Sequence, residues 1–192
     1  MGISEEFGLR ITGGELRGRS VTCPRGLAVR PTSSKVRQAF FNILGDRLRH
    51  ARFLDLFSGS GLMGFEALSR GATVTFVERH SPSRAAIKAT AEQFKLSEER
   101  YRVRGGDVLK VLPDLSGEEF DIVFADPPYK LCLGPAVAEL LVRHRLLGAG
   151  ALYVVEHMSD DPVTLTDGSL ERVDFRQYGG TAISMFQQVC TK

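Results

Sequence analysis

The chain has 192 residues, 43% of them hydrophobic, which is enough for one substantial core with a small appendage. The net charge is +2, and no window approaches the eighteen or more consecutive apolar residues of a membrane span, so a soluble cytoplasmic protein without a membrane partner is expected. The three cysteines fit neither a disulfide framework nor a zinc site, and the four histidines have no ligand spacing, so no metal is expected.

Positive charge is concentrated at the start of the chain. Residues 1–52 contain 10 Lys and Arg against 4 Asp and Glu, whereas residues 53–192 contain 15 against 19. This asymmetry is typical of an appendage that holds a polyanion, and equally of a solvated basic face. We expect an RNA-binding extension over residues 1–32 and the main domain over residues 33–192.

Residues 8–22 alternate polar and apolar side chains around Gly13-Gly14, which predicts a β-hairpin. Its arginines would project from a small ribbon toward phosphates. After a loop, Ser33 or Ser34 could cap a helix that runs to about Leu48. In this helix we expect Lys35 and Arg37 to face outward.

Residues 53–64 predict a short strand that carries Asp55, a turn at Gly59-Ser60-Gly61, and a helix through about Arg70. Glycines allow a cofactor to approach the backbone more closely than a Cβ permits, and the helix N-terminus offers free N–H groups. With Gly64 the turn also satisfies GxGxxG, but a lone match to that pattern is weak.

Two more acidic residues follow predicted strands. The strand over residues 72–77 ends in Glu78, which could accept hydrogen bonds from the hydroxyls of an adenosine ribose, in NAD or in S-adenosylmethionine. A helix over residues 81–95 leads to the strand Tyr101–Arg104. Asp107 comes just after that strand, where it could bind an adenine amino group, cap the short helix over residues 108–112, or do both.

The apolar run Phe120–Ala125 ends abruptly in Asp126-Pro127-Pro128-Tyr129. Each proline fixes its own φ and pushes the preceding residue toward extended geometry, so the carboxylate and its neighbouring carbonyls are restrained. With the ring of Tyr129 they could form a pocket for a flat group that carries an NH2. A strand end with a proline turn and a surface tyrosine is the alternative.

The remaining pattern predicts a helix over residues 135–147, a break at Gly148-Ala149-Gly150, a strand over 151–155, and a hairpin of residues 171–178 and 182–189. The fold class is therefore α/β: a doubly wound, mostly parallel, seven-stranded Rossmann-like sheet with an antiparallel C-terminal edge strand. Ligands bind at the carboxyl ends of such strands. The residues expected at that edge are Asp55, Gly59, Gly61, Glu78, Asp107 and Asp126.

Together these motifs resemble those of the class I S-adenosylmethionine-dependent methyltransferases, and more narrowly the RsmD family of bacterial ribosomal RNA guanine-N2 methyltransferases. The resemblance covers residues 8–189. The segments that carry it are Arg30-Pro31-Thr32, Val36-Arg37, Phe41–Leu44, Asp55–Gly61, Glu66–Ala72, Glu78, Gly106-Asp107, Asp126–Tyr129 and Tyr178-Gly179. The chain departs from the usual family pattern at Ser34-Lys35, Gln38 and Gly180, which bears on RNA contact and helix capping.

The resemblance implies an enzyme that uses S-adenosyl-L-methionine to methylate a guanine of 16S ribosomal RNA, free or in the small ribosomal subunit. Nothing in the sequence demands more than a monomer, so a monomer is expected. The residues implied for the cofactor are Asp55, Gly59, Ser60, Gly61, Glu78, Arg79, Gly106 and Asp107. The residues implied for the target amine are Asp126, Pro127, Pro128 and Tyr129. Candidate RNA contacts are Arg10, Arg17, Arg19, Arg30, Thr32, Lys35 and Arg37.

Three alternatives stay open from the sequence. Asp-Pro-Pro-Tyr recognises an amine more than a particular ring, so another base, such as adenine at N6, or a protein amide could be the target. The GxGxxG pattern with Glu78 would also suit a nicotinamide oxidoreductase, although the chain is short for a substrate domain. An inactive RNA-binding relative is the third.

Overall fold

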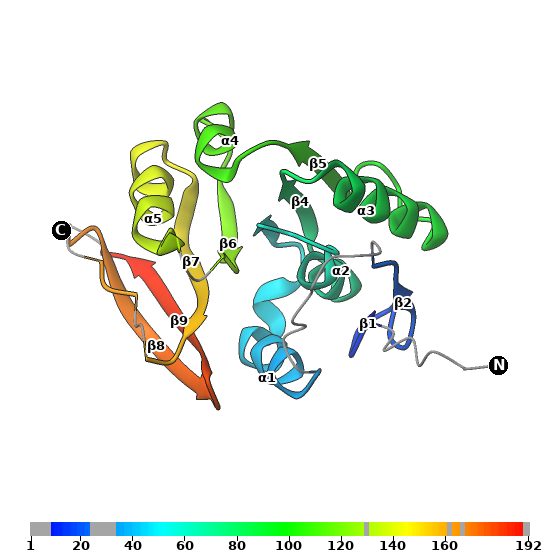
Figure 1. Ribbon diagram of the computed structural model, residues 1–192, viewed down its shortest axis with the longest axis horizontal. Helices are drawn as coiled ribbons and strands as arrows, with labels where there is room; N and C mark the ends of the chain where they lie inside the picture. The colour runs from blue at the N-terminus through cyan, green and yellow to red at the C-terminus, as the bar shows by residue number, and fades with distance from the viewer. Residues whose placement is uncertain (1–8, 24–33, 129–130, 161–162, 166–167, 190–192) are drawn as a thin grey trace.

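The computed structural model describes residues 9–23, 34–128, 131–160, 163–165 and 168–189 (Figure 1). Three expected site residues, Arg30, Thr32 and Tyr129, lie outside these ranges, and the side chain of Lys35 is not described. Among the described residues, no helix is long and apolar enough to cross a membrane.

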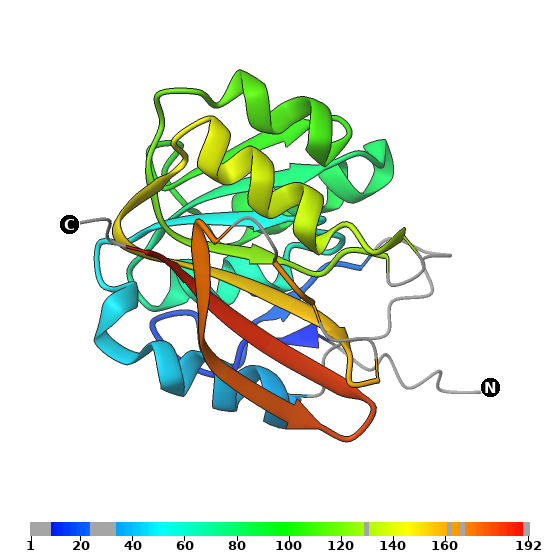
Figure 2. The same ribbon diagram turned by 90° about the vertical axis from the view of Figure 1, so that its left-hand side faces the viewer.

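The predicted α/β fold is confirmed. One seven-stranded sheet has the order β5-β4-β3-β6-β7-β9-β8. The strands β3 to β7 are parallel, and β9 runs antiparallel between β7 and the edge strand β8. The bounds are β3 Arg52–Leu56, β4 Thr73–Glu78, β5 Tyr101–Gly105, β6 Phe120–Ala125, β7 Leu147–Met158, β8 Leu170–Tyr178 and β9 Thr181–Gln188. Figure 2 shows β6, β7 and β8 all running toward one side of the molecule.

Helices cover both faces of the sheet, as a doubly wound fold requires (Figure 1). One buried cluster joins α4 and α5 to one face, and a second joins α1, α2, α3 and the N-terminal hairpin to the other. The bounds are α1 Ser34–Leu44, followed by the 3-10 helix η1 Gly45–Leu48, then α2 Leu62–Ser69, α3 Ser81–Gln93, α4 Val108–Asp114 and α5 Gly134–Arg143.

The predicted N-terminal hairpin is present and packs on the body. Its strands β1 (Leu9–Arg10) and β2 (Ser20–Val21) are antiparallel, and Ile11 and Leu16 belong to the same buried cluster as the helices beside them. At Gly14, where φ is 78°, a Cβ would lie only 1.8 Å from the carbonyl oxygen of Ser69 at the end of α2. Glycine is therefore required for this close contact. The proposed boundary near residue 32 falls outside the described residues.

The predicted helix over residues 135–147 is too long, and the strand after it is too short. Helix α5 ends at Arg143, because Arg145 adopts a left-handed conformation with φ of 53° and Leu146 turns into the core, where it is fully buried. The glycines at 148 and 150 lie inside β7, where the pairing with β6 changes register. At its other end β7 extends beyond Val155 and includes Glu156, because its pairing with β9 continues to Met158.

Candidate active site

Four acidic residues form a row across the carboxyl ends of four neighbouring strands: Glu78 in β4, Asp55 in β3, Asp126 just after β6, and Glu156 in β7. Side chains alternate between the two faces of a strand. The residues two positions before each acid all belong to the core cluster beneath α1, α2 and the hairpin, so the four acids share that face; they are Phe76, Phe53, Phe124 and Val154.

The acids lie in a poorly solvated environment. Asp55, Glu78 and Glu156 are 2%, 7% and 3% exposed. Burial raises the pKa of Asp55 to about 7, although a hydrogen bond from the backbone N–H of Gly64 opposes the shift. Burial also raises the pKa of Asp126 well above its ordinary value, and the charges of Glu156 and Asp55 add to the effect. Such a site favours a ligand that brings positive charge or hydrogen-bond donors.

The glycine turn after β3 combines a packed position with an open one. At Gly61, the N-cap of α2, φ is 78° and a Cβ would approach Ile87 to 2.9 Å. At Gly59, where φ is 54°, only the carbonyl oxygen of Phe57 would come within 4 Å of a Cβ. Gly61 therefore serves the packing of the turn, whereas the backbone at Gly59 stays accessible to a ligand. Ser60 between them is buried.

Glu78 holds this turn in place. One carboxylate oxygen accepts from the N–H of Gly59 at 2.8 Å, and the other accepts from the N–H of His80 at 2.7 Å. Each carboxylate oxygen has a further lone pair for a ligand hydroxyl. Arg79 is exposed beside it.

Asp107 and Gly106 stand at the next strand end, after β5. Asp107 caps α4, because its Oδ1 accepts from the N–H of Leu109 at 3.0 Å, so the predicted capping role is confirmed. The side chain is exposed, and its second carboxylate oxygen could accept from a ligand. Contact with an adenine amino group therefore stays a prediction.

Arg37 does not face outward, and that prediction is wrong. The side chain is buried, and its Nε donates to Oε1 of Glu66 at 2.7 Å. The reason is that Glu66 lies fully buried in α2 and requires cationic partners, which Arg37 and Arg70 supply. Thr12 donates to the same carboxylate from its backbone N–H and its hydroxyl. The network therefore fastens the hairpin to α1 and α2.

The other arginines of the hairpin are all exposed and differ in their contacts. Arg19 donates to the carbonyl of Gln93 at 2.8 Å, and its guanidinium lies 4.5 Å from the ring centre of Phe94, at the end of α3. Arg10 donates to the carbonyl of Gly18 within the hairpin. Arg17 is exposed, and its side chain forms no hydrogen bond or ion pair within the part of the chain that the structure describes.

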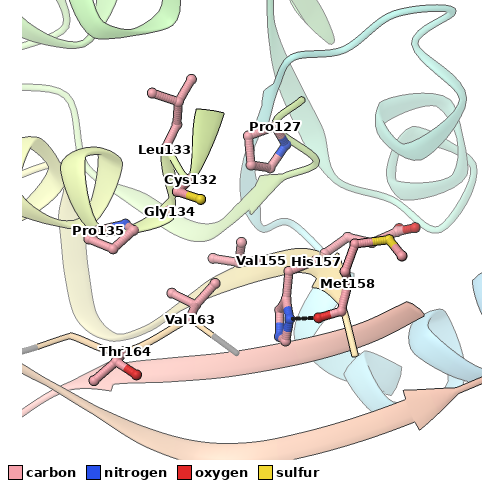
Figure 3. Close-up of a pocket in the computed structure, with 11 residues that line it drawn as sticks. Pro127, Cys132, Leu133, Gly134, Pro135, Val155, His157, Met158, Val163 and Thr164 are labelled. Atoms are coloured by element: carbon pink, nitrogen blue, oxygen red, sulfur yellow. Dashed lines mark hydrogen bonds between the residues drawn. The ribbon is translucent and has the colours of Figure 1, made fainter. Parts of the chain in front are cut away.

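A small recess lies next to Pro127, where β6 and β7 end (Figure 3). Its volume is about 130 Å³, and apolar side chains from Pro127, Leu133 and Val163 contribute to its lining. At its border, Nδ1 of His157 donates to the carbonyl of Met158, and Nε2 lies 2.9 Å from the hydroxyl of Ser184. Both ring nitrogens are thus engaged, which indicates a packing role for this histidine.

A family model described as Conserved hypothetical protein 95 matches residues 9–187. The chain belongs to this family. The resemblance to the RsmD group is confirmed, because the Ribosomal RNA small subunit methyltransferase D of Haemophilus influenzae is 35% identical over 157 residues, which is 81% of each chain. The protein of the same name from Escherichia coli K12 is 36% identical over 169 residues, 85% of this chain and 83% of that one.

A solved structure supports the same assignment of the fold. The yhhF protein of Escherichia coli superimposes with a TM-score of 0.83 at 30% sequence identity, and the match covers 94% of this chain and 98% of that chain. The two chains therefore share their fold over nearly their whole length.

Sequence reasoning missed Glu156. The sequence pattern predicts a strand over residues 151–155, which ends one residue before this acid. The signal was nonetheless present, because Glu156 ends an apolar run as Glu78 does. No group of three His, Cys, Asp or Glu that could hold a metal ion occurs within the described ranges.

Proposed function

We propose that this protein transfers a methyl group from S-adenosylmethionine to the exocyclic N2 amine of a guanine in small-subunit ribosomal RNA. The observation that carries the proposal is the row of acids at the strand ends, in which Asp126 and its two prolines follow β6, the strand next to the one that leads into the glycine turn. The names of the relatives support both the methyl transfer and the ribosomal RNA substrate.

The residues at β3, β4 and β5 fit the cofactor. The backbone at Gly59 is open, Glu78 has lone pairs for ribose hydroxyls, and Asp55 would attract the positive charge of the methionine part. Asp107 would accept from the adenine amino group. When bound, S-adenosylmethionine supplies an electrophilic methyl group.

Asp126 would hold the amine that accepts the methyl group. The lone pair of a guanine NH2 is delocalised into the ring, so acceptors on its hydrogens are needed to draw the nitrogen toward tetrahedral geometry. The carboxylate of Asp126 and the carbonyls fixed by the prolines provide such acceptors. Correct positioning of the two reactants supplies about 7–11 kcal/mol of the barrier. Positive charge develops on the nitrogen, Asp126 stabilises it, and the proton leaves after the transfer.

RNA would approach over the N-terminal segment, with Tyr129 stacking on the extruded base for about 1–3 kcal/mol. Because Arg37 is buried and the exposed Arg19 is held against the end of α3, we assign both to holding the hairpin. The remaining proposed contacts are Arg10, Arg17, Arg30, Thr32 and Lys35. We further propose that the protein acts as a monomer in the cytoplasm.

The test is transfer of labelled methyl groups to small ribosomal subunits and to free RNA from cells that lack the protein, followed by nucleoside analysis. N2-methylguanosine is expected, and its source identifies the substrate form. A different methylated nucleoside would move the target to another amine. Absence of transfer to either substrate would overturn the proposal, and titration with NADH would then test the oxidoreductase alternative.

A further inference from the structure

We propose that Glu156 is a specificity-determining residue, which accepts a hydrogen bond from N1–H of the target guanine while Asp126 holds the neighbouring N2 amine. This inference rests on the function proposed above, and it concerns how the site distinguishes guanine from other bases that carry an amine.

The sheet places Glu156 next to Asp126. Ala125 of β6 pairs with Val155 of β7, and each acid is the following residue on its strand. Neighbouring strands lie about 4.8 Å apart, so the carboxyl groups of the two acids are close enough to converge on adjacent atoms of one ligand. The two acids share one face of the sheet, because Phe124 and Val154 before them belong to the same cluster.

The order of the strands assigns Glu156 to the substrate rather than to the cofactor. Strand β6 separates Glu156 from Asp55, and the glycine turn and Glu78 lie still farther along the sheet. On its other side, Glu156 pairs with Ile183 of β9, which offers an apolar side chain. The position therefore borders the target amine and not the candidate cofactor residues.

Glu156 is a buried acid that lies beside a second acid. The residue is 3% exposed, and its charge contributes to the raised pKa of Asp126. Two acids placed together in a poorly solvated site destabilise the folded protein, whereas an apolar residue at the end of β7 would not. Acids with a raised pKa, such as Asp126 beside Glu156, cluster at functional sites.

The chemistry of guanine matches two adjacent acceptors. Its Watson–Crick edge presents N1–H beside the N2 amine, so both positions donate. Adenine presents an unprotonated N1 beside its amine, and an ionised carboxylate can only accept hydrogen bonds. Glu156 and an adenine N1 would therefore repel one another, which would exclude adenine although it carries an amine.

The test compares guanine with 2-aminopurine at the modified position of RNA that is assembled into small subunits. 2-Aminopurine retains the N2 amine, but its N1 is an acceptor. The wild-type protein should prefer guanine. In Glu156→Gln the amide can donate to N1 of 2-aminopurine, so the ratio of kcat/KM for guanine over 2-aminopurine should fall by at least about tenfold, as expected when one polar contact is reversed.

The matched control is Glu171→Gln, an exposed acid on β8, which should keep the wild-type ratio. The affinity for S-adenosylmethionine and the melting temperature show whether Glu156→Gln is folded. An unchanged ratio in a folded Glu156→Gln protein would overturn the inference, as would a wild-type protein that uses both bases equally. If wild type transfers nothing to guanine N2, the proposed function itself has failed.

A second variant covers the case in which Glu156→Gln does not fold. Glu156→Asp keeps the carboxylate but shortens its reach, so it should keep the preference for guanine while kcat/KM for guanine falls at least about tenfold. Wild-type kcat/KM with guanine in that variant would show that the carboxylate does not contact the base.

Discussion

Nε of Arg37 lies 2.7 Å from Oε1 of Glu66, and the two side chains are 4% and 0% exposed. The same carboxylate also pairs with Arg70 in the next turn of α2. This buried ion network lies between α1, α2 and the N-terminal hairpin, so it connects the start of the chain to the face of the sheet that carries the acids.

Glu66→Gln should lower the free energy of unfolding by about 3–5 kcal/mol, because it leaves buried guanidinium groups without their counter-charge. Urea unfolding measures the effect. The matched control is Glu139→Gln, since Glu139 and Arg143 form an exposed pair with the same spacing along a helix. Loss of that pair should change stability by less than about 1 kcal/mol. Equal effects of the two substitutions would contradict the role of the buried network.

Gly14→Ala should destabilise the protein much more than Gly18→Ala does. Both glycines have positive φ, so both substitutions introduce backbone strain of about 1–2 kcal/mol. Only at Gly14 does the new Cβ meet the carbonyl of Ser69, whereas nothing lies within 4 Å of it at Gly18. Both variants carry the backbone strain, so the difference between their melting temperatures in thermal unfolding reports the steric clash at residue 14. Similar melting temperatures would show that the hairpin is not seated on α2.

Arg17→Glu should weaken RNA binding and make the slope of log affinity against log salt shallower, because fewer counterions are released. Binding at several salt concentrations measures both quantities. Lys110→Glu, on α4 at the opposite face of the sheet, is the control and should leave the slope unchanged. Arg19→Ala should instead lower the melting temperature, since it removes the contacts to Gln93 and Phe94. A wild-type slope in Arg17→Glu would mean that the hairpin does not hold RNA.

Asp55→Asn should stabilise the protein more at pH 8 than at pH 5. The folded pKa of about 7 exceeds the ordinary 3.8, so the folded state binds the proton more tightly and this group's contribution to stability falls as pH rises from about 4 to about 7. Because asparagine does not titrate, the stabilisation should be larger by about 2–3 kcal/mol at pH 8. Urea unfolding at both pH values tests this. A stabilisation independent of pH would contradict the raised pKa.

Asp126→Ala should abolish methyl transfer while the affinity for S-adenosylmethionine stays within several-fold, because in the proposed site Asp126 holds the substrate amine and Asp55 the cofactor. Calorimetric titration and transfer assays measure the two effects. Asp114→Asn, an exposed acid at the end of α4, should leave both unchanged. Loss of cofactor binding in Asp126→Ala would reassign this residue.

Local pattern predicted the sheet well because its central strands are buried on both faces. Phe120–Ala125 reads as an apolar run, and all but Asp121 are in fact buried. The end of α5 could not be predicted in this way, since it depends on a left-handed Arg145 and on the burial of Leu146.

In the candidate site, too, some residues could be placed from the local sequence pattern and others could not. Asp55, Glu78 and Asp126 follow apolar runs directly, so their place at the strand ends could be inferred. The partner of Arg37 could not, because Glu66 is 29 residues away and only tertiary packing brings the two together. Glu156 was missed because β7 continues beyond Val155 through its pairing with β9, which the local sequence pattern does not reveal.

The insertion of β9 between β7 and β8 has a consequence for the nascent chain. Strand β7 is followed in sequence by β8, with which it does not pair, so its outer edge lacks a partner until β9 has also been synthesised. During that interval the apolar segment Ala151–Val155 presents an open edge, the kind of surface on which partly made chains associate with one another. Synthesis of β9 thus supplies the pairing partner that covers this edge of β7.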